Sequence, residues 1–174
     1  MSYKIIENNK INRVNWKYLL SKSRFTTPFQ TSEYLDFFNS VPGLSAKVFA
    51  MEESNELLAL CVVSYQKEKG IKGYFSRRAL IYGGPLIAKG EDGKRALGTL
   101  LYELNKELKR KVIYVETRNF NDYSEYKEVF LKNCWDYEPY LNFQISLYGK
   151  TLEDLLSAMK YNRRREIQLS LKEG

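Results

Sequence analysis

The sequence contains no histidine, and this absence excludes several classes of catalytic and metal site. Without an imidazole, a Ser-His or Cys-His catalytic pair cannot form, and most zinc sites lose a preferred ligand. Cysteine is also scarce, because only Cys61 and Cys134 are present and both lie in apolar runs. Such cysteines are typical of small core residues in a reduced protein, so we expect neither a metal site nor a disulfide framework.

Long hydrophobic runs are missing as well. The longest run, Leu57 to Val63, is far too short to cross a bilayer. The first residues, MSYKIIENNKINRV, lack the apolar core of a signal peptide. We therefore expect a cytoplasmic protein without a transmembrane segment.

A glycine-rich phosphate loop of the P-loop or Rossmann kind is also absent. The nearest stretch, RALG at 95–98, lies inside the helix that the sequence predicts over 91–110, and not at its start. No pair of acidic residues is spaced for general acid–base catalysis either. The residues by themselves thus identify no catalytic group.

What is present favours one globular domain with a positive charge. The chain has 174 residues, of which 44% are hydrophobic, enough for a single sizeable core. Its formal net charge is +7. This charge favours an anionic partner without choosing among such partners.

The hydrophobic periodicity predicts an α/β fold. Strands alternate with helices in the second half of the chain, which indicates a partly parallel sheet with both faces covered, whereas the first half supplies antiparallel strands. The predicted helices lie at 12–21, 32–41, 91–110 and 123–133, and the predicted strands at 3–6, 46–51, 57–66, 79–88 and 112–118, with another after a turn within 135–147. A basic loop is expected at 67–78.

Gly83-Gly84-Pro85 interrupts the strand predicted at 79–88. Glycines inside a strand mark a bulge or a close backbone approach, and proline cannot donate to the ladder. The interruption is therefore either a bulge at a sheet edge or a bulge that opens backbone groups toward a ligand, with Tyr82 beside it.

The last stretch, 151–174, combines a helical pattern with a cluster of cations. Thr151 is a suitable N-cap, and the apolar positions that follow recur every three or four residues up to Met159. The next position on that stripe is Arg163. Either the helix breaks near Asn162 and the arginines form a solvated face, or the helix continues and Arg163 faces a cleft that holds an anion.

Three stretches together resemble the first half of the Fem-type aminoacyltransferases, which build the interpeptide bridges of bacterial peptidoglycan. They are TPFQTSEYLDFF at 27–38, YGGPLIA at 82–88, and the stretch 144–174, which begins QISLYGK and ends with the basic segment. The resemblance implies a GNAT-like α/β domain, with a mixed sheet and helices on both faces, at 1–150. By the same resemblance, 151–174 would complete this domain and lead to a second one of the same kind.

The resemblance also implies a function. Fem-type enzymes transfer an amino acid from aminoacyl-tRNA to the side-chain amine of a diphosphate-bearing peptidoglycan precursor, without a metal or a further cofactor. This half would contribute to precursor binding. The positions that match the substrate-binding regions are Phe29, Gln30, Tyr82, Gly83, Gly84, Arg163, Arg164, Arg165 and Lys172.

Two positions depart from the family pattern, and other functions stay open. Asp36 stands where some members have a basic residue that contacts the diphosphate, and Ala88 where some have an acid. The alternatives are an N-acyltransferase for another envelope molecule, a catalytically silent interaction domain that forms a homodimer, and a nucleic-acid-binding module. An acetyl-CoA acetyltransferase is disfavoured, because GNAT enzymes hold the cofactor pyrophosphate with a glycine-rich loop that opens a helix.

Overall fold

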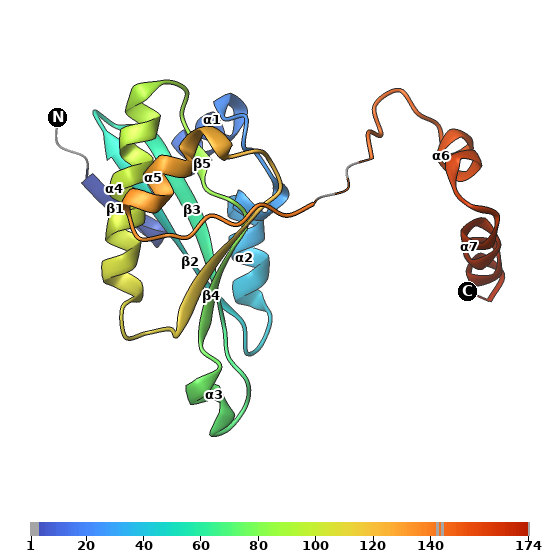
Figure 1. The fold of residues 1–174 in the computed structure, drawn as a ribbon, viewed down its shortest axis with the longest axis horizontal. Helices are drawn as coiled ribbons and strands as arrows, with labels where there is room; N and C mark the ends of the chain where they lie inside the picture. Colours follow the sequence, from blue (N-terminus) through green and yellow to red (C-terminus); the bar gives the residue numbers. More distant parts are fainter. Residues whose placement is uncertain (1–3, 142, 144, 174) are drawn as a thin grey trace. The chain divides into compact units, whose positions relative to one another are not determined.

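A computed structural model describes residues 4–141, 143 and 145–173 (Figure 1). The chain divides into two units, one ending at Pro139 and the other starting at Tyr140. The first unit holds a sheet and the helices that cover it, and the second holds two helices. The division falls eleven residues before the boundary at 150 that we expected. That 151–174 complete the first domain stays a prediction.

The elements follow the predicted order through most of the first unit. The first half contains β1 (Lys4–Glu7), η1 (Asn8–Lys10), α1 (Arg13–Lys22), η2 (Pro28–Gln30), α2 (Ser32–Ser40), β2 (Ser45–Glu53) and β3 (Glu56–Gln66). The second half contains α3 (Lys72–Phe75), β4 (Arg78–Gly83), β5 (Leu86–Ile87), α4 (Glu91–Leu108), β6 (Tyr114–Asn119), η3 (Ser124–Tyr126) and α5 (Lys127–Lys132).

The sheet is mixed, as predicted. Its strand order is β1-β2-β3-β4-β6, and β5 pairs with β3. The pairs from β1 to β4 are antiparallel, whereas β4 and β6 are parallel. Helix α4 provides most of the long connection that a parallel pair requires.

Helices cover both faces of this sheet (Figure 1). On one face, α4 packs the leucines of its predicted stripe against Cys61 and Val63 of β3. On the other face, α1 and α2 pack Trp16 and Phe38 in the same core cluster as Val62. Strand β3 is therefore buried on both sides, which explains its nearly continuous apolar sequence.

The interruption at Gly83-Gly84-Pro85 is a bulge of two residues. Strand β3 pairs Ser64 with Leu80 and Leu60 with Leu86, so the seven positions 80–86 face the five positions 60–64. Both glycines have positive φ, +81° and +82°, a conformation that residues with a Cβ rarely adopt.

Tyr123 fixes this bulge from the α4 side of the sheet. Its hydroxyl donates to the Pro85 carbonyl at 2.8 Å, and its buried ring stacks on Phe25 with 4.2 Å between the centroids. A Cβ on Gly84 would lie only 2.5 Å from the Tyr123 hydroxyl oxygen. Burial raises the pKa of Tyr123, so the hydroxyl stays protonated and keeps donating.

Two sequence predictions are wrong in this region. No residue described within 135–147 is in a strand, although the pattern there alternates; residues 142 and 144 lie outside the described part. Leu141 and Phe143 are 92% and 94% exposed, because an isolated segment has no neighbouring strand to bury its apolar side. Cys134 is exposed and has φ +61° at the end of α5, so only Cys61 is a core cysteine.

We expect Tyr123→Phe to lower the free energy of unfolding by about 1–2 kcal/mol, because it leaves the buried Pro85 carbonyl without its donor. Urea unfolding measures this change. Tyr114→Phe is the matched control, since its side chain is 47% exposed and should tolerate the loss of a hydroxyl. Equal stability of the two variants would contradict the role assigned to the Tyr123 hydroxyl.

Candidate functional site

The candidate site lies where the parallel strands β4 and β6 end. Their pairing runs from Arg78 opposite Tyr114 to Gly83 opposite Asn119, and the strands then part, since the chain after β4 turns to pair with β3. In open α/β sheets, ligands bind outside the carboxyl ends of parallel strands.

Four half-buried rings gather at this edge, and we call them the aromatic site: Phe29, Tyr34, Tyr82 and Phe120. Phe29 is at the centre, with centroids 5.3 Å from Tyr34, 5.8 Å from Tyr82 and 5.5 Å from Phe120. The rings come from η2, α2, β4 and the residue after β6. They leave apolar surface in contact with solvent, which suits a partly apolar ligand.

Polar groups border the aromatic site. The Arg118 guanidinium lies 5.8 Å from the Tyr82 ring centroid, and its Nε donates to Glu116 at 2.7 Å. This hydrogen bond raises the pKa of Arg118, so the cation is retained. Burial raises the pKa of Tyr34, whose hydroxyl lies 3.3 Å from the Ser64 hydroxyl. The site thus combines a cation with a neutral phenol.

Gln30 holds β3 and β4 apart beneath this site. Its side-chain Nε2 donates to the Tyr82 carbonyl at 2.8 Å, and its Oε1 accepts from the Val62 N–H at 2.8 Å. These two backbone groups would pair directly if the β3–β4 ladder continued in register. The Gln30 side chain is fully buried. Both polar atoms of the side chain therefore serve backbone groups and help to position Tyr82, and direct contact of Gln30 with a ligand stays a prediction.

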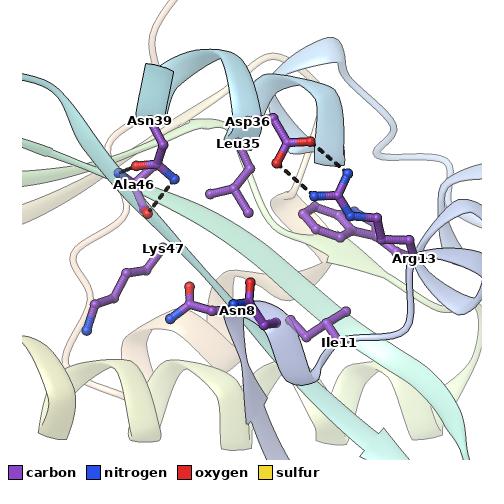
Figure 2. Close-up of a pocket in the computed structure, with 10 residues that line it drawn as sticks. Asn8, Ile11, Arg13, Leu35, Asp36, Asn39, Ala46 and Lys47 are labelled. Carbon is purple, nitrogen blue, oxygen red and sulfur yellow. Dashed lines mark hydrogen bonds and ion pairs between the residues drawn. The ribbon is translucent and has the colours of Figure 1, made fainter. Parts of the chain in front are cut away.

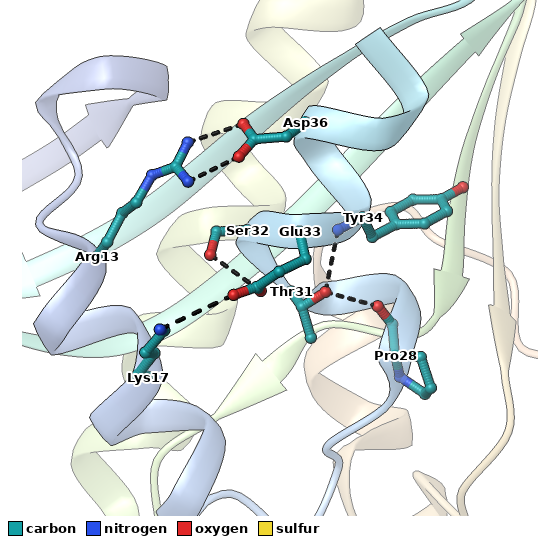
Figure 3. Close-up of polar contacts among 8 residues, drawn as sticks. All are labelled: Arg13, Lys17, Pro28, Thr31, Ser32, Glu33, Tyr34 and Asp36. Carbon is teal, nitrogen blue, oxygen red and sulfur yellow. Dashed lines mark hydrogen bonds and ion pairs between the residues drawn. The ribbon is translucent and has the colours of Figure 1, made fainter. Parts of the chain in front are cut away.

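The turn that carries Phe29 is held by contacts between α1 and α2 (Figure 3). The Thr31 hydroxyl accepts from the Tyr34 N–H at 3.1 Å and donates to the Pro28 carbonyl at 2.8 Å. Arg13 of α1 donates both terminal nitrogens to the Asp36 carboxylate at 2.7 Å. These contacts join α1, η2 and α2 into one support for the aromatic site.

A hollow of about 610 Å³ lies between η1, α1, α2 and β2 (Figure 2). Its two cations are already opposed by acids, since Arg13 binds Asp36 and Lys47 Nζ lies 3.6 Å from a Glu107 oxygen. The amide of Asn39, which also lines the hollow, is used by the Ala46 backbone. Asp36 thus neutralises the neighbouring Arg13, so this hollow does not favour a diphosphate.

The opening of α4 is acidic. Gly90 is the N-cap residue and has φ +87°, and Glu91 and Asp92 occupy the first turn. A Cβ on Gly93 would collide with the Ala88 carbonyl. Asp92 forms an ion pair with Arg95, and both carboxylates lie at the positive end of the helix dipole, where they compete with a pyrophosphate for this position.

The predicted cations of the last stretch lie in the second unit. This stretch forms α6 (Leu152–Ala158) and α7 (Tyr161–Glu173), and Thr151 caps α6 through a capping box with Asp154. The predicted break is confirmed, although it falls before Tyr161 and not at Asn162. The alternative prediction, a single helix that continues through Arg163, is wrong.

Arg163 is on the first turns of α7, with 76% of its side chain exposed, and it donates to Glu166 at 2.8 Å. Arg164 is half-buried, and its Nε has no hydrogen-bond partner in the described part of the chain. Arg165 and Lys172 are exposed, and because successive residues of a helix point about 100° apart, these cations are spread around α7 and do not share one face. Anion binding by this helix stays a prediction.

The structure therefore brings together part of the predicted site. Phe29 and Gln30 meet Tyr82 and the two glycines, which contribute shape rather than side chains. Sequence analysis missed Tyr34, Arg118 and Phe120. The only signal for the last two was their place at the end of a strand predicted to be parallel.

Two features are absent from the described part of the chain. Among residues 4–141, 143 and 145–173, no three His, Cys, Asp or Glu side chains are grouped so that they would hold a metal ion. Within the same ranges, no helix has the length and apolar character needed to span a bilayer.

Comparison with solved structures identifies the fold as that of the GNAT acyltransferases. A ribosomal-protein-alanine N-acetyltransferase from Brucella melitensis biovar Abortus 2308 aligns with a TM-score of 0.56 and 10% identity, covering 84% of this chain and 100% of its own. The aminoglycoside N-acetyltransferase AAC(6')-Iy, in complex with a bisubstrate analogue, gives 0.57 and 9%, covering 84% and 99%.

A predicted acetyltransferase with acetyl-CoA from Clostridium acetobutylicum gives a TM-score of 0.52 and 13% identity, covering 82% of this chain and 96% of its own. No family model matches the sequence, and no curated protein matches it significantly. At these identities the likeness shows the fold alone, so the predicted GNAT-like fold is confirmed.

We expect Gln30→Leu to lower the free energy of unfolding by about 2–4 kcal/mol, because it leaves the Val62 N–H and the Tyr82 carbonyl unsatisfied in a buried position. Thermal and urea unfolding measure the loss. A stability equal to wild type would contradict the bridging role.

Gln30→Glu gives a second readout, through pH. The introduced carboxylate cannot donate to the Tyr82 carbonyl, and burial raises its folded-state pKa above the ordinary value of about 4.3. A raised carboxyl pKa means that stability falls as pH rises from that value. The deficit relative to wild type should therefore shrink in acid, and a deficit independent of pH would contradict this mechanism.

The Arg13–Asp36 pair should give the opposite pH dependence. The Arg13 guanidinium holds the pKa of the Asp36 carboxyl below its ordinary value, mainly through their hydrogen bonds. A depressed pKa contributes stability that is present above the ordinary value of about 3.9 and is lost as pH falls through the folded-state pKa. The difference in melting temperature between wild type and Arg13→Ala should therefore vanish in acid.

Because the pair is exposed, this difference should also be small and should decrease with salt. Lys89→Ala is the control, since it removes an exposed cation for which the structure shows no ion pair. A difference that persists in acid would assign the effect of Arg13 to packing instead.

Proposed function

We propose that this chain is the acceptor-binding part of a Fem-like N-acyltransferase, which transfers an amino acid from aminoacyl-tRNA to an amine of a peptidoglycan precursor in the cytoplasm. The observation that carries the proposal is the acidic opening of α4. In a GNAT-like fold this helix start is where a CoA pyrophosphate would bind, and here Glu91 and the Arg95-paired Asp92 already occupy the positive end of the helix dipole. A donor other than CoA is therefore favoured.

The aromatic site is our candidate for part of the acceptor site. Phe29, Tyr82 and Phe120 present ring surface to the apolar faces of a sugar or peptide. Arg118 supplies a charge for a carboxylate or a phosphate, and Tyr34 supplies a phenol hydroxyl. The cations of α7 would neutralise the diphosphate of the precursor.

This assignment gives the described residues a binding role and no chemical one. An aminoacyl ester is already activated, so a neutral amine held against its carbonyl carbon can attack it: the new C–N bond forms, the ester C–O bond breaks, and the tRNA hydroxyl leaves with the proton that the amine loses. Holding two reactants together supplies much of the rate acceleration in such a reaction. Residues that fix the acceptor amine therefore contribute to catalysis without exchanging a proton or forming a covalent bond.

Calorimetric titration with a UDP-linked muramyl pentapeptide tests the proposal. We expect saturable binding that Arg118→Ala weakens by about tenfold or more, because a charge-assisted contact is lost. Arg163→Ala should weaken it similarly if α7 holds the diphosphate. Arg24→Ala is the matched control, because Arg24 is also half-exposed, pairs with Glu125 and lies over a ring.

Titrations with UDP alone and with acetyl-CoA complete the experiment. Weak binding of UDP would assign most of the affinity to the sugar and peptide, as the aromatic site requires. Saturable binding of acetyl-CoA would overturn the choice of donor. Absence of precursor binding, with the fold intact by circular dichroism, would overturn the acceptor-binding role and favour an interaction domain.

A further inference from the structure

Residues 67–77 form an arm that joins β3 to β4 and carries α3 at its tip, away from the sheet (Figure 1). The arm is closed by its own hydrogen bonds. The Glu68 N–H donates to the Ser76 hydroxyl at 2.8 Å, and Arg77 Nε donates to the Tyr74 carbonyl at 3.1 Å. A Cβ on Gly73 would collide with the Glu68 carbonyl, so the turn is tightly wound. Its shape therefore depends little on the core.

Three large apolar side chains of the arm face solvent. Ile71 is 86% exposed, Tyr74 is 64% exposed and Phe75 is 73% exposed. None of them belongs to either core cluster of the first unit. Three such residues within five positions form a contiguous exposed patch, and such patches mark surfaces that contact a partner or a membrane.

Cations surround this patch. The arm and the first residue of β4 contain Lys67, Lys69, Lys72, Arg77 and Arg78, against one acid, Glu68. A hollow of about 650 Å³ beside the arm is lined by three cations and one acid, together with Tyr74, two glycines of the arm and residues 42–44; the charged residues are Lys67, Lys69, Arg77 and Glu68. An apolar tip with a basic collar is the pattern of segments that lie in the interface of an anionic bilayer.

The details favour a lipid surface over a nucleic acid. Base binding requires open aromatic faces. The Arg77 guanidinium already covers the Tyr74 ring at 4.4 Å, and Phe75 contacts the same ring edge-on, with centroids 5.2 Å apart. The most exposed residue of the tip, Ile71, has no ring to stack. An aliphatic side chain at the tip instead gains free energy when it leaves water for the acyl region.

We propose that the 67–77 arm docks this protein peripherally on a membrane rich in anionic lipid. Ile71 and Phe75 enter the boundary between headgroups and acyl chains, and the lysines contact the lipid phosphates. The hollow beside the arm has the size and charge to take one phosphate headgroup. This proposal does not depend on the acyl-transfer function, so either one can fail while the other stands.

Sedimentation with vesicles tests the proposal on the full chain. We expect binding to phosphatidylcholine vesicles that contain phosphatidylglycerol, reduced by salt, and little binding to phosphatidylcholine alone. The double variant Ile71→Ser/Phe75→Ser should weaken partitioning by about tenfold or more, through loss of apolar burial. Lys69→Ala/Lys72→Ala should weaken it by about tenfold or more on anionic vesicles only.

Matched controls separate the arm from general effects of charge and hydrophobicity. Val14→Ser/Phe37→Ser removes apolar side chains that are 73% and 64% exposed on α1 and α2. Lys89→Ala/Lys132→Ala removes two exposed lysines elsewhere in the first unit. Both controls should partition like wild type. Because all eight positions are exposed, melting temperatures should change little.

A Phe75→Trp variant gives a readout that does not rely on weakened binding. Its emission should shift to the blue on anionic vesicles, and glycerol 3-phosphate in solution should produce no shift, which separates a lipid surface from a free phosphate. Failure to bind anionic vesicles would overturn the proposal. Vesicle binding that is unchanged in the arm variants and abolished by Leu141→Ser/Phe143→Ser would also overturn it. The same holds if the arm variants lose tRNA binding and keep vesicle binding.

Discussion

The bridge made by the Gln30 side chain is the contact on which the candidate site depends. A continued β3–β4 ladder would bring the Val62 N–H and the Tyr82 carbonyl together, and the two strands would form an ordinary hairpin. The inserted amide satisfies both groups while it holds the strands apart. Tyr123 satisfies the Pro85 carbonyl from the other face. Together these side chains make a two-residue bulge compatible with a buried sheet, because they pair the Val62 N–H and the carbonyls of Tyr82 and Pro85.

The distribution of acidic and basic side chains differs between the parts of the molecule. The opening of α4 and the hollow beside Asp36 are places where the fold or the family resemblance suggests an anion, yet carboxylates occupy both. The excess positive charge is instead concentrated in the arm between β3 and β4 and in α7. A GNAT-like fold with this distribution fits an enzyme whose donor is not CoA, and it fits contact with anionic surfaces at the basic segments.

Sequence periodicity was sufficient for most elements and insufficient for the site. The stripe of leucines in α4, the apolar run of β3 and the glycines of the bulge each predicted their local structure, because spacing and φ preferences act over a few residues. The prediction of a strand within 135–147 was wrong. An alternating pattern indicates which side of a strand would be buried, but a strand also needs a neighbouring strand to pair with. Tyr34, Arg118 and Phe120 could not be found, since Tyr34 and Phe120 contact Phe29, and Arg118 contacts Tyr82, across separate elements.

The sequence by itself determined that this is a basic α/β protein without imidazole chemistry, with a bulge at Gly83-Gly84 and a helical, cationic end. Only the tertiary structure decided which side chains are buried, which are paired and which are exposed. It buried Gln30, paired Asp36 with Arg13, and exposed Ile71 and Phe75. The physical reason is that charge and spacing are local properties of a chain, whereas burial and partnership depend on residues that folding brings from distant positions.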